Sequence, residues 1–568
     1  MKFFLSIFLC AASLVSCANI GSHVPATSTE PPAFHDARSR ALYLYSRSRL
    51  ASDEGDYVSA LSNLREAIDR DPSSAFLYTA VAENKLKIGQ VQEALEFINK
   101  AIKLDPAYRE PYVMAGVLMA SAGKDSEAAG YLRTAIKLDP AKEDAYLHLA
   151  VSLTRLFEYE EAVNNLKELI KLNSESVLGY YYLGRTYSQM KLYRDAVGYF
   201  KKTLDLRPEF TQASIDMAIS YEALGDYDKA IEVYQTLLDE DESRVAVQQR
   251  LIQLLIQQHR LEEALEQLTQ SADSGLSGAE TMRKIGLIHL ELEQYDDAIT
   301  VFSDLLEKDP SAHPIRIYLG VAYEEKGDLD RALTEFQKIP TDSSVYVDAI
   351  GHIAFILSEK GKNDAAIEIL KNAIAVNPSQ IELYLNLSTI YETAGKVETA
   401  LQLLLDSEKS FADEPRLHFR IGVLYDTLGK KQESIDRMKK VLSLSPKDAQ
   451  ALNYLGYTYA EMGINLDEAL GFLKLAVEIR PNDGFILDSL GWVYFKMKKY
   501  DEAVSNLEEA SRIVDDDSTI LEHLGDAYVA RRDSKKALKV YKKALELDPD
   551  RKEVADKIHR FKGEQGER

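Results

Sequence analysis

Apolar and polar positions repeat with a period of 34 residues along most of the chain. One column of this repeat is a proline that follows an acidic residue, as at Pro72, Pro106 and Pro140, and the same spacing reaches Pro446. One extra residue then shifts the column, which continues to Pro549. Since self-similarity at a fixed period indicates stacked structural units, we predict fifteen repeats over residues 41–549.

A second column supports the same period independently. It lies twelve residues before the end of each repeat, and fourteen of its fifteen members are alanine. The members are Ala60, Ala94, Ala128, Ala162, Ala196, Ala230, Ala264, Ala298, Ala332, Ala366, Ala400, Ser434, Ala469, Ala503 and Ala537.

The repeat over residues 178–208 shows how one unit is expected to fold. Tyr180, Leu183 and Tyr187 recur at helical spacing, which predicts a first helix with one apolar face. Ala196 and Phe200 are four residues apart, so they lie on one face of a second helix. The closing proline lacks an N–H and ends that helix. One helix pair cannot bury its apolar face alone, so neighbouring pairs must stack into an all-α solenoid.

The whole motif resembles the tetratricopeptide repeat. Its residues are Tyr180-x₂-Leu183-Gly184-x₂-Tyr187, Ala196-x₃-Phe200 and Pro208. The resemblance implies a right-handed superhelical solenoid of about fifteen helix-turn-helix repeats. Residues 550–568 are predicted to form a capping helix and tail, because Val554, Ile558 and Phe561 stand at helical spacing. Repeat seven lacks the glycine and proline columns, so a bend or a longer loop is expected between residues 41–276 (repeats one to seven) and 277–549 (repeats eight to fifteen).

The first sixteen residues are predicted to be a lipoprotein signal peptide. Lys2 precedes an apolar run that is too short to span a bilayer. The sequence Leu14-Val15-Ser16-Cys17 resembles the bacterial lipobox, which implies cleavage before Cys17 and acylation of its thiol, with palmitate among the chains. Ala18, where aspartate would favour retention, favours the outer membrane by the same resemblance. The alternatives are an ordinary signal peptide and an uncleaved anchor. Residues 17–40 are expected to be the lipidated cysteine and a flexible tether.

Composition narrows the function classes. A formal charge of −23 argues against nucleic acid as a partner. No cysteine follows Cys17, which excludes a disulfide framework, a zinc ribbon and a thiol nucleophile from the body of the protein. The sequence holds no HExxH pair and no phosphate-binding glycine loop. We therefore expect no cofactor, no metal site, no small-molecule substrate and no enzymatic activity.

Candidate contact residues follow from the resemblance, because positions five and nine of the first helix line the concave surface in tetratricopeptide proteins. Many of these positions are apolar here, so they either mark a binding surface or are buried by tight winding. The polar and aromatic candidates are Tyr181, Arg185, Asn453, Tyr457, Asp488, Trp492 and Asp526. Trp492, the single tryptophan, is the foremost candidate, with a packing role as the alternative.

The last stretch, Arg531 to Arg568, holds 13 Lys and Arg against 8 Asp and Glu. This excess either steers the end of the chain to an acidic partner or lipid face or is an ordinary solvated surface.

These observations together predict a non-catalytic protein–protein interaction scaffold, lipid-anchored at the periplasmic face of the bacterial outer membrane. It would bind protein partners on its concave surface, contact the membrane through the N-terminal lipid only, and assist assembly of a secretion, pilus or exopolysaccharide-export complex. The alternative is an accessory or regulatory subunit of an envelope polysaccharide or peptidoglycan synthase.

Overall fold

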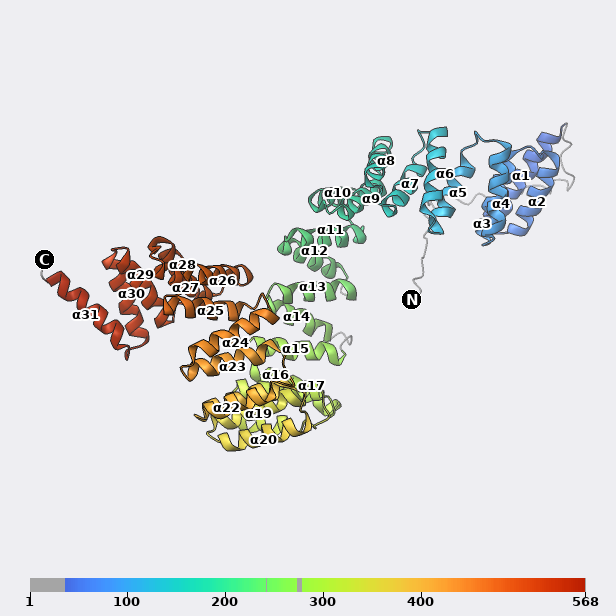
Figure 1. The fold of residues 1–568 in the computed structure, drawn as a ribbon. Coiled ribbons are helices and arrows are strands. Elements are labelled where there is room, and N and C mark those ends of the chain that lie inside the picture. The colour runs from blue at the N-terminus through green and yellow to red at the C-terminus, as the bar shows by residue number, and fades with distance from the viewer. Residues whose placement is uncertain (1–35, 242, 273–277, 567–568) are drawn as a thin grey trace. The chain divides into compact units, whose positions relative to one another are not determined.

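A computed structural model describes residues 36–241, 243–272 and 278–566, and side chains as far as Arg560. The predicted signal peptide, the lipobox with Cys17 and nearly all of the predicted tether lie outside the described residues. Within the described ranges the chain forms 31 helices and no strand (Figure 1). The first thirty helices follow one another as fifteen consecutive pairs, which confirms the predicted repeat solenoid.

The chain divides after Arg260 into two compact units, with α13 ending the first unit and α14 beginning the second. The helices of the first unit are α1 (Ala37–Asp53), α2 (Tyr57–Arg70), α3 (Ala75–Lys87), α4 (Val91–Leu104), α5 (Glu110–Ser121), α6 (Asp125–Leu138), α7 (Asp144–Arg155), α8 (Tyr159–Leu172), α9 (Val177–Gln189), α10 (Tyr193–Leu206), α11 (Thr211–Leu224), α12 (Tyr227–Glu240) and α13 (Val245–Gln257).

The second unit holds the remaining helices. They are α14 (Leu261–Ser271), α15 (Ala279–Glu291), α16 (Tyr295–Lys308), α17 (His313–Glu325), α18 (Leu329–Gln337), α19 (Tyr346–Glu359), α20 (Asn363–Val376), α21 (Ile381–Thr393), α22 (Val397–Ser407), α23 (Pro415–Thr427), α24 (Lys431–Leu444), α25 (Ala449–Met462), α26 (Leu466–Ile479), α27 (Gly484–Lys496), α28 (Tyr500–Ile513), α29 (Ser518–Ala530), α30 (Ser534–Leu547) and α31 (Lys552–Gly566).

The alanine column marks where the two helices of a repeat approach each other. All fifteen of its members, Ser434 included, are fully buried, and so is the large residue one turn later, as at Phe200 and Phe336. In the first helix a glycine often faces that large residue. A β-carbon on Gly184 would lie 2.7 Å from Cε1 of Phe200, closer than real contacts allow. Small residues at these crossings therefore set the close spacing of each pair.

The last helix, α31, closes the exposed apolar end of the second unit. Val554 is fully buried and Ile558 is 6% exposed, and both belong to the apolar cluster that includes Ala527 and Tyr541. This confirms the predicted capping helix for these two residues, whereas the side chain of Phe561 lies outside the described ones. No helix in the described part of the chain combines the length and the apolar composition that crossing a membrane requires.

Candidate functional site

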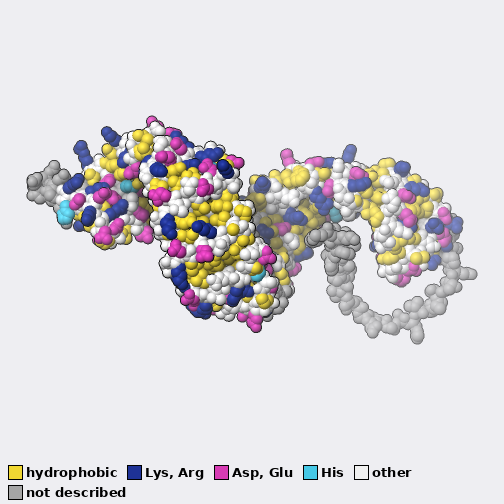
Figure 2. Space-filling model, turned by 60° about the horizontal axis from the view of Figure 1, so that its bottom comes forward, with side chains coloured by type: hydrophobic (Ala, Val, Ile, Leu, Met, Phe, Trp, Pro, Cys, Tyr) yellow, Lys and Arg dark blue, Asp and Glu magenta, His cyan; other side chains and the backbone are white. Residues whose placement is uncertain are grey.

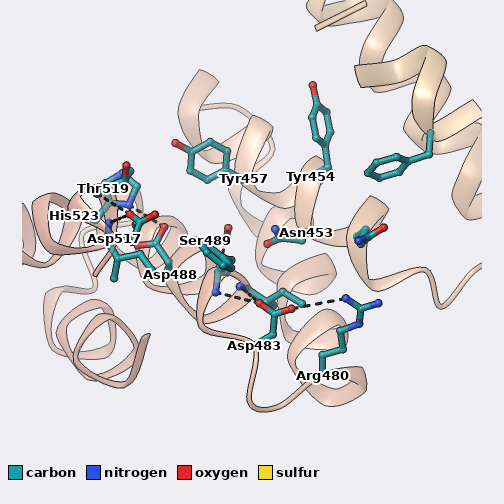
Figure 3. A pocket seen from close by; sticks show the side chains of 15 residues that line it. Asn453, Tyr454, Tyr457, Arg480, Asp483, Asp488, Ser489, Asp517, Thr519 and His523 are labelled. Atoms are coloured by element: carbon teal, nitrogen blue, oxygen red, sulfur yellow. Dashed lines mark hydrogen bonds and ion pairs between the residues drawn. The ribbon is translucent and has the colours of Figure 1, made fainter. Parts of the chain in front are cut away.

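A cavity of about 520 Å³ opens on the first helices of repeats twelve to fifteen, which are α23, α25, α27 and α29 (Figure 3). Five of the seven candidate contact residues lie on three of these helices: Asn453 and Tyr457 on α25, Asp488 and Trp492 on α27, and Asp526 on α29. The cavity is lined by Phe419, Gln450, Asn453, Tyr454, Tyr457, Arg480, Asp483, Phe485, Ile486, Asp488, Ser489, Asp517, Thr519, Ile520 and His523.

Two of the lining carboxylates are fixed by the helix starts. Asp483 precedes α27, and its Oδ1 accepts hydrogen bonds from the backbone N–H groups of Phe485 at 3.1 Å and Ile486 at 3.2 Å. Asp517 precedes α29, and its Oδ1 accepts hydrogen bonds from the backbone N–H groups of Thr519 at 2.7 Å and Ile520 at 3.0 Å. Because these N-cap bonds satisfy the first turns of both helices, they also hold the two carboxylates at the cavity wall.

Asp488 and His523 join α27 to α29 across the cavity. The imidazole Nδ1 lies 2.9 Å from Oδ1 of Asp488 and 3.0 Å from Oδ2, and both residues are 7% exposed. The imidazole also stacks on the Trp492 indole, with ring centroids 4.0 Å apart and planes 17° apart. Asp488 is thus held at the site by His523 of α29.

α25 contributes uncharged hydrogen-bonding groups. Burial raises the pKa of Tyr457 to about 12 and that of Tyr454 to about 12 as well, so both phenols stay protonated at neutral pH. Oδ1 of Asn453 is shielded from solvent and has no hydrogen-bond partner among the described residues. An acceptor left without a partner in this way costs free energy.

Trp492 does not line the cavity. It is 8% exposed, its indole stacks on Phe495 at 4.7 Å as well as on His523, and its Nε1–H donates to Glu461. This placement agrees with the packing alternative for Trp492. Its predicted contact with a partner stays untested.

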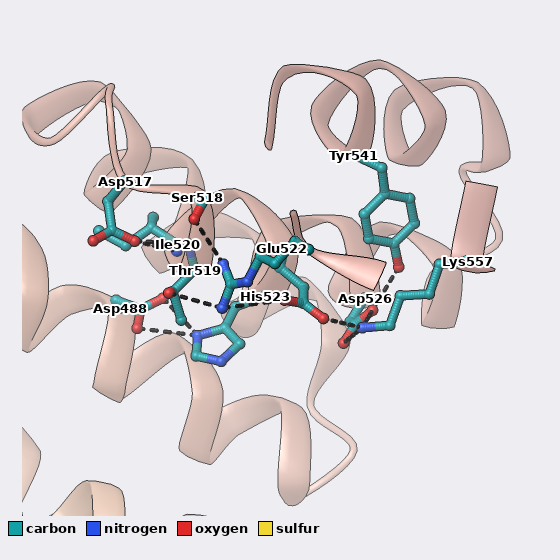
Figure 4. A network of polar contacts seen from close by, with 11 residues as sticks. Asp488, Asp517, Ser518, Thr519, Ile520, Glu522, His523, Asp526, Tyr541 and Lys557 are labelled. Carbon is teal, nitrogen blue, oxygen red and sulfur yellow. Dashed lines mark hydrogen bonds and ion pairs between the residues drawn. The ribbon is translucent and has the colours of Figure 1, made fainter. Parts of the chain in front are cut away.

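Asp526 also lies away from the cavity, because α31 covers it (Figure 4). Its carboxylate accepts hydrogen bonds from Lys557 Nζ at 2.7 and 2.8 Å and from the Tyr541 hydroxyl at 2.5 Å. Lys557 also donates to Glu522 at 2.7 Å. Burial lowers the pKa of Lys557, but the hydrogen bonds to both carboxylates outweigh it and raise that pKa overall. The candidate contact residue of the last repeat, Asp526, is thus paired within the chain itself.

Tyr181 and Arg185 belong to the first unit and lie together on α9. The Tyr181 hydroxyl donates to Asp216 Oδ2 at 3.0 Å, and the residue is only 5% exposed. Burial, with the Asp216 carboxylate next in effect, raises the pKa of Tyr181. The exposed Arg185 guanidinium lies 5.8 Å from the centre of the Tyr181 ring. Of this pair, Arg185 is therefore the group that is accessible.

The structure brings Asn453, Tyr457 and Asp488 together in one cavity, while the sequence alone misses several other lining residues. The capping aspartates Asp483 and Asp517 stand directly before their helices, and that N-cap pattern is a readable signal. Among the residues that the structure describes, no cluster of three or more His, Cys, Asp and Glu is arranged to hold a metal ion. The cavity offers carboxylates and neutral phenols beside aromatic surface, a lining that suits a ligand rich in hydrogen-bond donors.

Comparison with known proteins gives matches along most of the chain. Models described as tetratricopeptide repeat match residues 45–109, 144–176, 189–243, 221–274, 250–313, 283–344, 357–418, 415–448 and 486–550. A TPR repeat-containing protein of Pseudomonas aeruginosa, PA4667, is 35% identical over 77 residues, which is 13% of either chain.

Solved structures align over longer stretches at lower identity. The structure of Naa15/Naa10 bound to HypK-THB covers 92% of this chain and 96% of its own, at 13% identity and a TM-score of 0.42. Yeast Tom70 covers 74% of this chain and 96% of its own, at 14% identity and a TM-score of 0.38. The repeat models, which match most of residues 45–550, and the fifteen helix pairs agree: this chain belongs to the tetratricopeptide-repeat family.

Proposed function

We propose that this protein is a non-catalytic scaffold that holds a segment of a protein partner on the inner surface of repeats twelve to fifteen. The observation that carries the proposal is the cavity itself, which gathers exposed aromatic surface, carboxylates and phenols on the first helices of four successive repeats. Solenoids of this family are typically non-catalytic interaction proteins, which supports binding as the role of the cavity.

Phe485 is the residue whose removal tests this site most cleanly. Its side chain lines the cavity and is 56% exposed, so Phe485→Ala removes contact area without opening the apolar core. We expect partner affinity to fall about tenfold or more, as for a typical aromatic contact residue at an interface. Phe355→Ala is the matched control, since Phe355 is 50% exposed on α19 and does not line the cavity. Equal losses in both variants, or none in either, would place the binding surface elsewhere.

We also propose that the scaffold is attached by a lipid on Cys17 to the periplasmic face of the bacterial outer membrane. There it would help to assemble a secretion, pilus or exopolysaccharide-export complex. The support for the anchor is the lipobox-like sequence Leu14-Val15-Ser16-Cys17. Several acyl chains on one residue would give durable attachment, since each buried CH₂ contributes about 0.8 kcal/mol.

The anchor is tested by metabolic labelling with an alkyne analogue of palmitate. Cys17→Ala should abolish the label, and Cys10→Ala, which removes the other cysteine of the chain, should leave it intact. A labelled Cys17→Ala protein would disprove the anchor without touching the assignment of the inner cavity.

A further inference from the structure

Positive charge gathers at the C-terminal end of an otherwise acidic protein. Residues 531–568 carry 13 Lys and Arg against 8 Asp and Glu. In the whole chain the balance is reversed, with 68 Lys and Arg against 91 Asp and Glu. Figure 2 shows basic and acidic side chains interspersed over most of the drawn face. Within the C-terminal stretch, five of the thirteen basic residues lie on α30, the second helix of the last repeat, which holds a single acidic residue, Glu546.

Four lysines form what we call the α30 lysine face: Lys535, Lys539, Lys542 and Lys543. Their spacing of four, seven and eight residues places them on one side of the helix, and all four are exposed. They surround a surface hollow of about 510 Å³ that is also lined by Leu538, Val540 and Glu546. No salt bridge joins any of the four lysines to a carboxylate of the described chain. Glu546 is the acidic residue in the lining of the hollow, so the lining carries a net positive charge.

These lysines oppose the local stability of their own helix. The first turn of α30 carries Lys535 and Lys536 and no acidic residue, although cations are unfavourable at the positive end of a helix. The preceding second helix, α28, has Asp501 and Glu502 at the equivalent positions. Lys535, Lys539 and Lys543 also repel one another at successive spacings of four residues. Helix stability therefore does not account for Lys535 at the start of α30 or for the lysines at successive spacings of four, whereas an anionic binding partner does.

We propose that the α30 lysine face docks on a membrane surface that contains anionic phospholipids. Lysine acts as a strongly hydrated point charge, which suits many mobile headgroups, whereas arginine suits the bidentate carboxylate geometry of a protein partner. All five basic residues of α30 are lysines. Their aliphatic stems, together with Leu538 and Val540, offer apolar contact at the headgroup level. This docking is independent of the inner cavity and of Cys17.

Vesicle flotation of the full chain tests the proposal. The parent protein in this assay carries Cys17→Ala, so that no acyl chain contributes to binding. We expect binding to phosphatidylcholine vesicles that contain phosphatidylglycerol, little binding to pure phosphatidylcholine, and loss of binding at high salt. Each lysine near an anionic surface contributes about fivefold in affinity, so replacing the four face lysines by glutamine should weaken binding by at least tenfold.

The control replaces four other exposed lysines by glutamine, which changes the net charge equally: Lys103, Lys137, Lys167 and Lys474. This control should bind anionic vesicles like the parent. The proposal is overturned if both sets of substitutions weaken binding equally, or if the parent does not distinguish the two kinds of vesicle. Absence of vesicle binding, combined with salt-sensitive binding to an acidic protein that the face substitutions abolish, would assign the face to that protein and likewise overturn the lipid proposal.

Discussion

Gly320 allows a close helix crossing whose energetic cost can be worked out from the structure. It lies on α17, and a β-carbon added there would be 2.3 Å from Cε1 and 2.6 Å from Cζ of Phe336 on α18. The Phe336 ring has no room to withdraw, because it is 1% exposed and stacks on His352 at 4.8 Å. Gly320→Ala must therefore push α17 and α18 apart.

The expected cost combines two opposing effects. Overpacking a buried site costs about 1–3 kcal/mol, and the higher helix propensity of alanine offsets up to about 1 kcal/mol of it. We expect the unfolding free energy of this repeat to fall by about 1–2 kcal/mol. Gly471→Ala on α26 is the matched control, because nothing lies within 4 Å of its added β-carbon. The control should be neutral or stabilising by up to about 1 kcal/mol.

A second substitution should relieve the clash. In repeats four and ten the same two columns hold alanine and leucine, as Ala150 with Leu166 and Ala354 with Leu370, and all four residues are buried. Phe336→Leu should therefore be less destabilising in the Gly320→Ala background than alone, with a coupling of about 1–2 kcal/mol.

Amide hydrogen exchange resolved to α17 and α18 is the suitable assay, because repeats contact mainly their neighbours and a global midpoint would dilute the effect. Additive effects of the two substitutions, or a Gly320→Ala protein as stable as the Gly471→Ala control, would refute this explanation of the crossing.

Two further predictions concern the last repeats. Lys557→Met should loosen α31 by about 1–3 kcal/mol, because it leaves Glu522 and Asp526 partly buried without their cation; unchanged exchange protection of α31 would contradict this. The Tyr528 hydroxyl donates a hydrogen bond to Glu508 and holds the pKa of that carboxyl below its ordinary 4.5. This bond therefore stabilises the folded state above pH 4.5, and its contribution is lost as the pH falls through the lowered pKa. Tyr528→Phe should therefore lower protection of α28 and α29 at neutral pH and bring the Glu508 pKa, followed by NMR, back toward 4.5; an unmoved pKa would show that the hydroxyl is not its cause.

Much of the fold could be predicted from the sequence because its determinants recur. The alanine column and the large residue one turn later are local and periodic. The sequence of each repeat therefore predicts where its two helices cross, as Ala332 and Phe336 do. The capping helix was readable from Val554 and Ile558 for the same reason.

The site was harder to predict, because it depends on contacts between repeats that differ from one another. Asn453, Tyr457 and Asp488 follow from their column, but the column does not reveal that α31 covers Asp526 or that Trp492 is enclosed by Phe495 and its neighbours. Those outcomes depend on which side chains of neighbouring helices contact Asp526 and Trp492. Such contacts differ from one repeat to the next, so the periodic pattern of the sequence does not predict them. Lipidation of Cys17 stays a prediction from the sequence.

The central claim is that the inner surface of repeats twelve to fifteen binds a protein segment, and site-specific photocrosslinking in the native cell tests it most directly. A photoreactive residue in place of Phe485, which lines the cavity, should yield a defined crosslinked partner whose contact peptide can be sequenced. The same residue in place of exposed Lys474, on the second helix α26, should yield no such product. Equal crosslinking from both positions, or a specific partner from position 474 alone, would contradict the claim.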